Sequence, residues 1–304
     1  MKNALAPRDL ILTLILVTLL GFSFIPIKIG LRELPPFALA GLRFFFAAVP
    51  LVLVIKPPRM PWREIAAYGL AIGVFQFGVL FLGMKLGMPA GLSSLVIQVQ
   101  VFFTIGLAIA FLGDRLQRHN VVGAGIAAAG IAVLAAQKLI EGAHSTLIGF
   151  ALVLVAAFSW AVGNIISKRA ASMHRADMFS LVVWSSLFPP LPLALLSYFF
   201  EGGSGVWGAV VSAGMLTWAC VLFLAWGATL FGFALWARLL NRYPTGLITP
   251  FALLIPVSGM ASGAIFLGES LAPLQAVGVA LVFAGLAENV YGPRIRAWLL
   301  SRER

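Results

Sequence analysis

Charged side chains are scarce in this sequence. Asp, Glu, Lys and Arg make up 10% of its 304 residues, whereas 61% are apolar, and the mean hydropathy is +1.03. Soluble globular chains carry about 25% charged residues. So few polar groups cannot cover a water-soluble body. The composition therefore indicates an integral membrane protein whose solvent is the lipid bilayer.

Residues suited to catalysis or metal binding are also rare. The single cysteine, Cys220, excludes an intrachain disulfide and a cysteine metal cluster. The three histidines, His119, His144 and His174, fall in predicted loops, and the sequence has no His-Glu-x-x-His or Gly-x-Ser-x-Gly motif. It has no phosphate-binding loop either, which excludes ATP as the fuel. We predict no enzyme activity, no metal and no cofactor. A membrane-embedded enzyme is kept only as a minor alternative.

The sequence contains only ten acidic residues. Glu288 alone lies within a predicted helix, near the cytoplasmic end of that helix. A proton-driven pump normally needs a titratable group inside the membrane. The sequence therefore predicts transport with weak or no coupling to protons, and Lys28 is the reserve candidate for a proton carrier.

The net charge of +11 does not indicate a nucleic-acid partner. The basic residues stand singly or in pairs between long apolar runs, as expected for membrane anchors. With the N-terminus inside, sixteen Lys and Arg fall in cytoplasmic segments, and three, Arg32, Lys85 and Lys138, fall outside. This bias predicts that both termini are cytoplasmic.

Apolar runs of about 20 residues, long enough to span a bilayer, occur ten times. The first run continues without a small-residue cleavage site, so we interpret it as a helix and not as a signal peptide. The eighth is blurred by glycines at its start, and we expect its span to begin near Met215. The predicted spans are Leu10–Ile29, Pro36–Ile55, Ile65–Met84, Ala90–Phe111, Asn120–Ala136, Leu147–Ser167, Met178–Phe199, Val206–Val211 extending to Leu240, Thr245–Leu267 and Pro273–Tyr291.

The sequence repeats itself at a constant offset of 155 residues over about 40 positions. Pro89-Ala90-Gly91-Leu92 aligns with Pro244-Thr245-Gly246-Leu247, and Phe111–Asp114 aligns with Phe266–Glu269. Gly123 and Gly130 align with Gly278 and Gly285, and at a different offset Lys28 matches Lys168. We predict an all-α membrane protein of two five-helix repeats, residues 8–137 and 146–292, followed by a basic cytoplasmic tail, residues 293–304. Because five is odd, the second repeat enters the membrane from the opposite side. Inverted repeats are typical of secondary transporters.

These motifs resemble the EamA-type branch of the drug/metabolite transporter superfamily. The segments Pro35–Phe44, Gln98–Thr104 and Phe158–Asn164 are similar to those of the bacterial inner-membrane exporters of cysteine and O-acetylserine. The resemblance implies a multi-pass protein of the bacterial inner membrane that exports small metabolites. One departure concerns a proline often found midway along the fourth helix: Pro256 occupies this place in the second repeat, but Val101 does in the first.

Polar residues inside the predicted spans are candidates for substrate binding because they are costly in a bilayer. Gln98 and Gln100 lie about 200° apart around one helix, so they belong to different stripes. Ser94 and Gln98 form one stripe, and Ser93, Gln100 and Thr104 form the other. One stripe is expected to line a cavity. The alternative is that both glutamines bond to neighbouring helices.

Trp160 and Asn164 share a face of the sixth helix and suit a small zwitterion with a side chain. The alternative is a packed tryptophan and an interhelical hydrogen bond. Arg43, about 10 Å inside the second helix, could attract a substrate carboxylate with help from Lys28. Alternatively, Arg43 ties helix ends together and Lys28 extends its amine to the membrane surface.

We therefore predict a secondary transporter that exports amino acids or their derivatives by alternating access. Export of aromatic amino acids or of toxic drug-like compounds is the alternative, and a channel is a further one. The predicted partners are a small-molecule substrate and the lipid bilayer, and the chain is expected to be a monomer or a homodimer.

Overall fold

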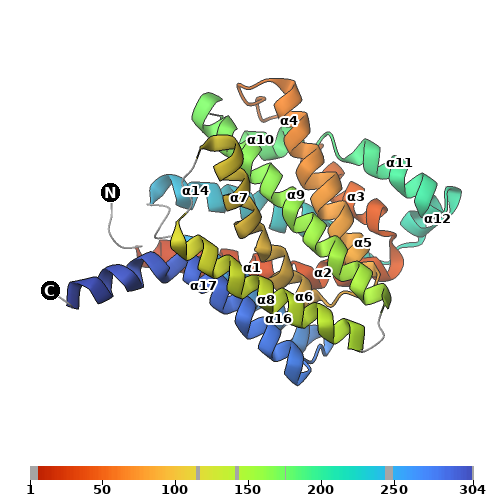
Figure 1. Ribbon diagram of the computed structural model, residues 1–304. Helices are drawn as coiled ribbons and strands as arrows, with labels where there is room; N and C mark the ends of the chain where they lie inside the picture. The colour runs from red at the N-terminus through yellow and green to blue at the C-terminus, as the bar shows by residue number, and fades with distance from the viewer. Residues whose placement is uncertain (1–5, 114–116, 141–143, 175, 244–248, 303–304) are drawn as a thin grey trace.

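The computed structural model describes residues 6–113, 117–140, 144–174, 176–243 and 249–302, and in this part of the chain the regular secondary structure is entirely helical, without a strand (Figure 1). Several helices run on from one another with a short break or a change of helix type. The helices are α1 Pro7–Phe22, α2 Phe24–Glu33, α3 Pro36–Ala48, α4 Trp62–Gly69, α5 Val79–Lys85, α6 Ala90–Val96, α7 Gln100–Leu112, α8 Arg118–Ile140, α9 His144–His174, α10 Met178–Ser185, α11 Pro190–Phe200, α12 Ser204–Ser212, α13 Met215–Leu222, α14 Gly232–Arg242, α16 Leu254–Leu267 and α17 Pro273–Arg302.

Among the described residues, seven helices are long and apolar enough to cross a membrane, or eight if one bent pair counts as a single span. Large apolar side chains cover the outside, and Leu53, Phe111 and Met215 are more than 70% exposed. Such a surface is compatible with lipid and incompatible with water. The start of α1 and the end of α17 lie on the same side of the molecule (Figure 1).

Two of the ten predicted spans differ from the expected form. The second helix ends at Ala48 and not at Ile55, because Pro50 has no N–H to continue it. The helix that contains Val206–Val211 is bent by 95° from the one that begins at Met215. It therefore does not extend the eighth span, which begins at Met215 as expected. The ninth span begins partly outside the described residues.

Two spans contain a π-helical segment at the same distance from their start. The segment η1, Leu70–Gly78, joins α4 to α5, and η3, Phe223–Phe231, joins α13 to α14. Each is nine residues long and begins eight residues after its helix does. Single-turn π segments often occur at functional sites, and these two bring residues from different parts of the chain to a common place.

Helices α8 and α17 pack along each other through glycines. A Cβ atom added to Gly123 would lie 2.6 Å from the carbonyl oxygen of Gly285, and one added to Gly130 would lie 2.7 Å from that of Gly278. The contact is crossed: the first glycine of one helix meets the second glycine of the other. Such close backbone approach is how helices associate where lipid gives no hydrophobic driving force.

Glutamates from distant parts of the sequence cap several helix N-termini. Glu269 accepts hydrogen bonds from the N–H groups of Ala90 (2.6 Å) and Gly91 (2.8 Å) at the start of α6. Glu33 accepts one from Gly214 (2.7 Å), directly before α13. Glu201 likewise accepts from the first turn of α3. A carboxylate at this position satisfies donors that a helix leaves unpaired and complements the helix dipole.

The glycine contact predicts a sharp difference between two Gly→Ala substitutions. In Gly285→Ala the new Cβ would lie 2.4 Å from the Gly123 oxygen and 2.6 Å from the Ala127 nitrogen, so the helices must separate. We expect a loss of about 1–3 kcal/mol, typical of overpacking. Gly125→Ala is the control, because Gly125 is exposed with no atom within 4 Å. Thermal unfolding in detergent should show a lower midpoint for Gly285→Ala only. Equal midpoints would contradict this packing.

Candidate functional site

A polar cluster joins α7 to α9. The amide nitrogen of Asn164 donates to Gln100 Oε1 at 2.7 Å and to Thr104 Oγ1 at 3.1 Å. Thr104 Oγ1 also lies 3.2 Å from Gln100 Oε1 and 2.8 Å from the Gln100 carbonyl. All three side chains are partly buried, and Trp160 lies one turn before Asn164, also partly buried. The structure thus joins the stripe of Gln100 and Thr104 to the face of Asn164, which the sequence analysis treated separately.

The other predicted stripe faces a different helix. Ser94 Oγ donates to the Gly91 carbonyl at 2.6 Å and lies 3.5 Å from that of Pro256. Gln98 Nε2 donates to the Ala252 carbonyl at 3.2 Å. Gln98 lies in the 3₁₀ segment η2, Ile97–Val99, and Ala252 in the 3₁₀ segment η4, Thr249–Leu253. Both side chains are buried. Gln98 therefore makes an interhelical contact of the kind that the sequence analysis gave as the alternative for both glutamines, and Gln100, which accepts from Asn164 of α9, makes one as well.

Arg43 is buried between the two π-helical segments, with 3% of its surface exposed. Its Nε donates to Thr229 Oγ1 of η3 at 2.9 Å. Its guanidinium carbon lies 3.8 Å from the centre of the Phe77 ring of η1. The Nη1 atom is buried with no hydrogen-bond partner. Glu33, the nearest acid in sequence, bonds instead to the Gly214 N–H.

The contacts of Arg43 can be compared with the cost of placing it in a membrane. Insertion measurements give about 3 kcal/mol for an arginine at the centre of a helix. A hydrogen bond to a charged group contributes about 2 kcal/mol, and a desolvated cation–π contact contributes about 2 kcal/mol. Thr229 and Phe77 together thus offset the insertion cost without using Nη1. The Nη1 amino group, which is buried, makes no hydrogen bond in this structure.

Gln76 stands next to Phe77 in η1 and is also buried, with 3% of its surface exposed. Its Oε1 atom has no hydrogen-bond partner. Buried polar atoms of this kind are rare in proteins, and each needs an explanation. A donor on Arg43 and an acceptor on Gln76 are thus both unused, on elements that pack against each other.

Lys28 does not point to the polar cluster. Its Nζ donates to the carbonyl oxygens of Met84 (2.9 Å) and Met88 (3.3 Å), at and beyond the end of α5. The sequence analysis expected a substrate contact or an amine at the membrane surface. In this structure neighbouring main-chain carbonyls accept the hydrogen bonds of this amine, and both expectations stay predictions.

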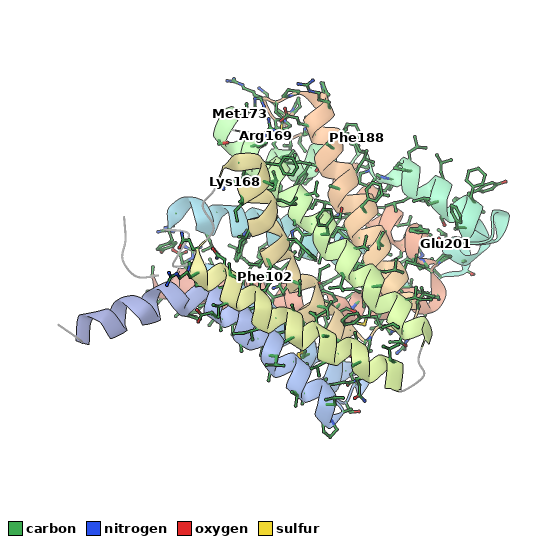
Figure 2. The ribbon with its side chains drawn as sticks, viewed as in Figure 1. Phe102, Lys168, Arg169, Met173, Phe188 and Glu201 are labelled. Carbon is green, nitrogen blue, oxygen red and sulfur yellow. The ribbon has the colours of Figure 1, made fainter. Side chains whose placement is uncertain are left out.

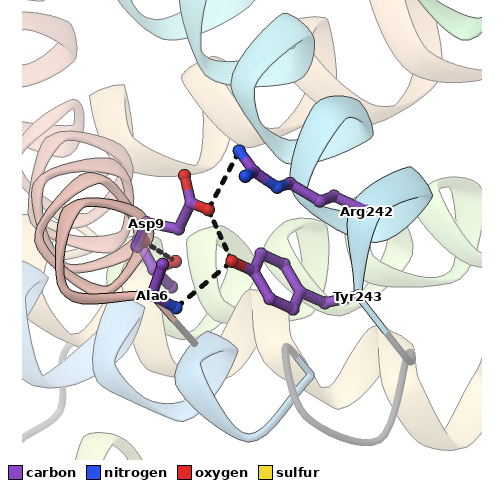
Figure 3. A network of polar contacts seen from close by, with 5 residues as sticks. Ala6, Asp9, Arg242 and Tyr243 are labelled. Carbon is purple, nitrogen blue, oxygen red and sulfur yellow. Dashed lines mark hydrogen bonds and ion pairs between the residues drawn. The ribbon is translucent and has the colours of Figure 1, made fainter. Parts of the chain in front are cut away.

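A buried acid that the sequence analysis overlooked connects α1 with α14. Asp9 is 3% exposed and accepts hydrogen bonds from Tyr243 OH at 2.5 Å and from Arg242 Nη1 at 3.1 Å (Figure 3). Tyr243 OH in turn accepts from the Ala6 N–H at 3.2 Å. Pro7, favoured at the first helical position, was a signal that Asp9 belongs to the first turn of α1.

An apolar groove of about 240 Å³ lies between α7 and α8. Phe102, Ile105, Gly106 and Ile109 of α7 line it, together with the first turns of α8. Asn120 is the polar residue of the lining, and its amide bonds to Asn289 at 2.8 Å. The groove suits a hydrocarbon chain better than a charged metabolite. Among the described residues, no three His, Cys, Asp or Glu side chains lie close enough to hold a metal.

Comparison with known proteins gives consistent matches over nearly the whole chain. Two relatives, one from Salmonella typhimurium and one from Escherichia coli, are each called a probable amino-acid metabolite efflux pump. They are 43% and 41% identical to this chain, and each alignment covers 95% of it and 97% of the relative. A probable terminal-alkyne amino-acid exporter of Streptantibioticus cattleyicolor is 27% identical and covers 94% of the chain.

The fold has a counterpart among solved structures. A protein of known crystal structure, 22% identical, superposes with a TM-score of 0.58 and covers 90% of this chain and 96% of its own. The family model described as the EamA-like transporter family matches residues 8–136 and again residues 147–290. The resemblance noted from the motifs is thereby confirmed, and the chain belongs to the EamA-like transporter family.

Proposed function

We propose that this protein exports small amino acids or close derivatives across the bacterial inner membrane. The relatives named as amino-acid metabolite efflux pumps support the substrate class. The observation that carries the proposal is Arg43, a buried cation whose Nη1 atom is unpaired inside an apolar helix bundle. A substrate carboxylate is the natural partner of such a guanidinium group.

The proposed site combines Arg43 with the polar cluster of α7 and α9. Gln100, Thr104 and Asn164 offer amide and hydroxyl groups, and Trp160 offers an aromatic face one turn away. Together these groups suit a zwitterion with a short side chain. We leave Lys28, Ser94 and Gln98 out of the proposed substrate contacts because their polar groups donate to main-chain carbonyls, whereas Gln100, Thr104 and Asn164 bond to one another through their side chains.

We further propose that the chain forms ten spans in two inverted repeats, residues 8–137 and 146–292, with residues 293–304 as a cytoplasmic tail. The double match to the family model supports this division. So do η1 and η3, which have the same length and the same place in their helices. Gly113 and Gly268, 155 residues apart, both end their helices in the left-handed conformation.

The crossed glycine contact between α8 and α17 also supports inversion. Gly123 corresponds to Gly278 and Gly130 to Gly285 at the 155-residue offset, yet Gly123 meets Gly285 and Gly130 meets Gly278. Two equivalent segments pair in this crossed way when a two-fold axis passes between them. For inverted repeats that axis lies in the membrane plane, as in many secondary transporters. Alternating access would then be an exchange of conformations between the repeats.

The orientation predicted from the basic residues can be tested by labelling. We propose that both termini are cytoplasmic, on the basis of the excess of Lys and Arg in segments on that side. Figure 2 places Lys168 and Arg169 toward one side of the bundle and Glu201 toward the other. In a Cys220→Ala background, Gly205→Cys should react with an impermeant thiol reagent on intact cells, whereas Arg59→Cys should not. The reverse pattern would rule out the proposed topology.

Purified protein in liposomes should transport labelled small amino acids, and the panel should include aromatic amino acids and a cationic drug. Saturable flux of small neutral amino acids supports the proposal. Flux of the cationic drug alone, with no amino acid moved, would refute it. Preference for aromatic amino acids would support the assignment as an amino-acid exporter but would refute small amino acids as its substrates.

Arg43→Met should lower amino-acid flux at least about tenfold, because it removes the proposed carboxylate partner and one charge-assisted hydrogen bond. Arg43→Lys should keep part of the flux, since it retains the charge but loses the geometry of the guanidinium group. Arg59→Met, an exposed position, is the matched control and should transport normally. Elution of each variant as a single peak in size-exclusion chromatography shows that the variant is folded. Normal flux in folded Arg43→Met would contradict the proposed site.

A further inference from the structure

The groove between α7 and α8 is apolar and opens to the outside of the bundle. Ile105 and Ile109 of α7 and Val121 of α8 line it, and Val121 is 53% exposed. Gly106 of α7 is also exposed, and no atom lies within 4 Å of a Cβ atom added to it. The wall of the groove is therefore hollow at Gly106. In a bilayer such an opening faces the hydrocarbon tails of lipids.

The size of the groove favours an acyl chain over a helix. Its lining on α7 runs from Phe102 to Ile109, which is about 10 Å along a helix axis. A volume of about 240 Å³ spread over this length leaves a cross-section of about 24 Å², or about 5 Å across. An α-helix with its side chains is about 10–12 Å wide. A helix from a second copy of the chain therefore does not fit, whereas one extended hydrocarbon chain does.

Positive charge lies at the end of the groove where α8 begins. The first N–H groups of α8 carry the positive end of its dipole, and its first turn contains no acidic residue. Arg118, the first residue of α8, is exposed and lies one turn before Val121, on the groove side of the helix. Helical side chains tilt toward the N-terminus, so this guanidinium group reaches toward the membrane surface. The site thus combines an apolar channel with an anion-binding end.

We propose that this groove binds one acyl chain of an anionic phospholipid, whose phosphate is held by Arg118 and the N-terminus of α8. The bound chain fills the space between α8 and α7, which carries Gln100 and Thr104 of the polar cluster. The lipid therefore supports one wall of the bundle without entering the proposed substrate site. The orientation proposed above places it in the inner leaflet, but binding depends neither on that orientation nor on the substrate.

Purified protein in detergent provides the test, with phosphatidylglycerol as the anionic probe and phosphatidylcholine of the same acyl chains as the zwitterionic one. Native mass spectrometry counts the lipids that stay bound, and titration gives their affinity. The wild type should retain one phosphatidylglycerol per chain in preference to phosphatidylcholine. Gly106→Leu should weaken phosphatidylglycerol binding about tenfold, the change expected when roughly two methylene groups leave the groove.

Gly208→Leu is the matched control for Gly106→Leu and should bind lipid normally. Gly208 of α12 is likewise exposed with no atom within 4 Å of an added Cβ, and α12 lies apart from α7 and α8 (Figure 1). Both variants should unfold at the wild-type temperature in lipid-free detergent. If Gly106→Leu does not fold, Ala124→Leu fills the same groove from α8.

The headgroup contact has its own variant. Arg118→Gln should weaken phosphatidylglycerol binding about fivefold, the contribution of one cation near an anionic lipid surface. Its binding of phosphatidylcholine should not change. Arg59→Gln is the control, because Arg59 is an exposed cation outside the groove lining.

Unchanged phosphatidylglycerol binding in Gly106→Leu would overturn the proposed lipid site. So would an equal loss in Gly208→Leu, which would indicate lipid that covers the whole surface without a specific site. Equal affinity of the wild type for both lipids would refute the anionic headgroup. A change from dimer to monomer in Gly106→Leu would show that the groove holds a second copy of the chain instead. Because no amino-acid flux is measured, failure of the proposed substrate would leave this result unchanged.

Discussion

The ends of helices that stop inside a membrane protein expose N–H and C=O groups that the bilayer cannot satisfy. Much of this structure depends on how those groups are paired. Glu269 pairs the N–H groups at the start of α6, and Glu33 pairs one before α13. Lys28 and Lys85 pair the carbonyls at the ends of α5 and α2. Each acid or amine comes from a different part of the chain, so satisfying the backbone also fixes which spans are neighbours.

These polar bonds sit at helix ends, whereas glycines hold α8 against α17 along their length. Close backbone packing permits little movement, while hydrogen bonds between ends can be exchanged for others.

The symmetry suggested by the backbone does not extend to the polar side chains. At the 155-residue offset, Gln100 and Thr104 correspond to Ile255 and Gly259. The hydrogen-bonding cluster of Gln100 and Thr104 with Asn164 therefore has no equivalent at the corresponding positions of the second repeat. Pro256, whose counterpart is Val101, adds to this difference. A transporter needs a backbone that can exchange conformations between its halves, but its substrate is not symmetric. Equivalent helix breaks in both proposed halves, together with one asymmetric polar cluster between the halves, meet both requirements.

The periodic part of the fold could be predicted from the sequence, because apolar runs, prolines and glycines act locally. The start of α13 at Met215 is an example. The pairing of polar groups could not be predicted, because it depends on residues that are far apart in the chain. Asp9 and Tyr243 are separated by 234 positions, and Arg43 and Thr229 by 186. Helix geometry correctly separated Gln98 from Gln100. Nothing local indicated which of them faces α9.

The π-helical segments explain how a charged residue is held at this depth. In an α-helix a threonine hydroxyl bonds to a carbonyl three or four residues earlier. Thr229 instead donates to the carbonyl of Leu224, five residues earlier, at 2.8 Å, which is the spacing of a π-helix. The hydroxyl thus gives its proton to the backbone and presents its lone pairs to Arg43. A threonine bonded in this way can only accept from the guanidinium group, so its orientation is fixed before any substrate arrives.

Phe77, in the other π-helical segment, contacts the same guanidinium group through its ring face. Conversion of either segment to a regular α-helix would rotate its following residues and displace one of these two supports. The position of Arg43 therefore depends on the irregular turns of two separate spans, which links any movement between these spans to the cation proposed to bind the substrate.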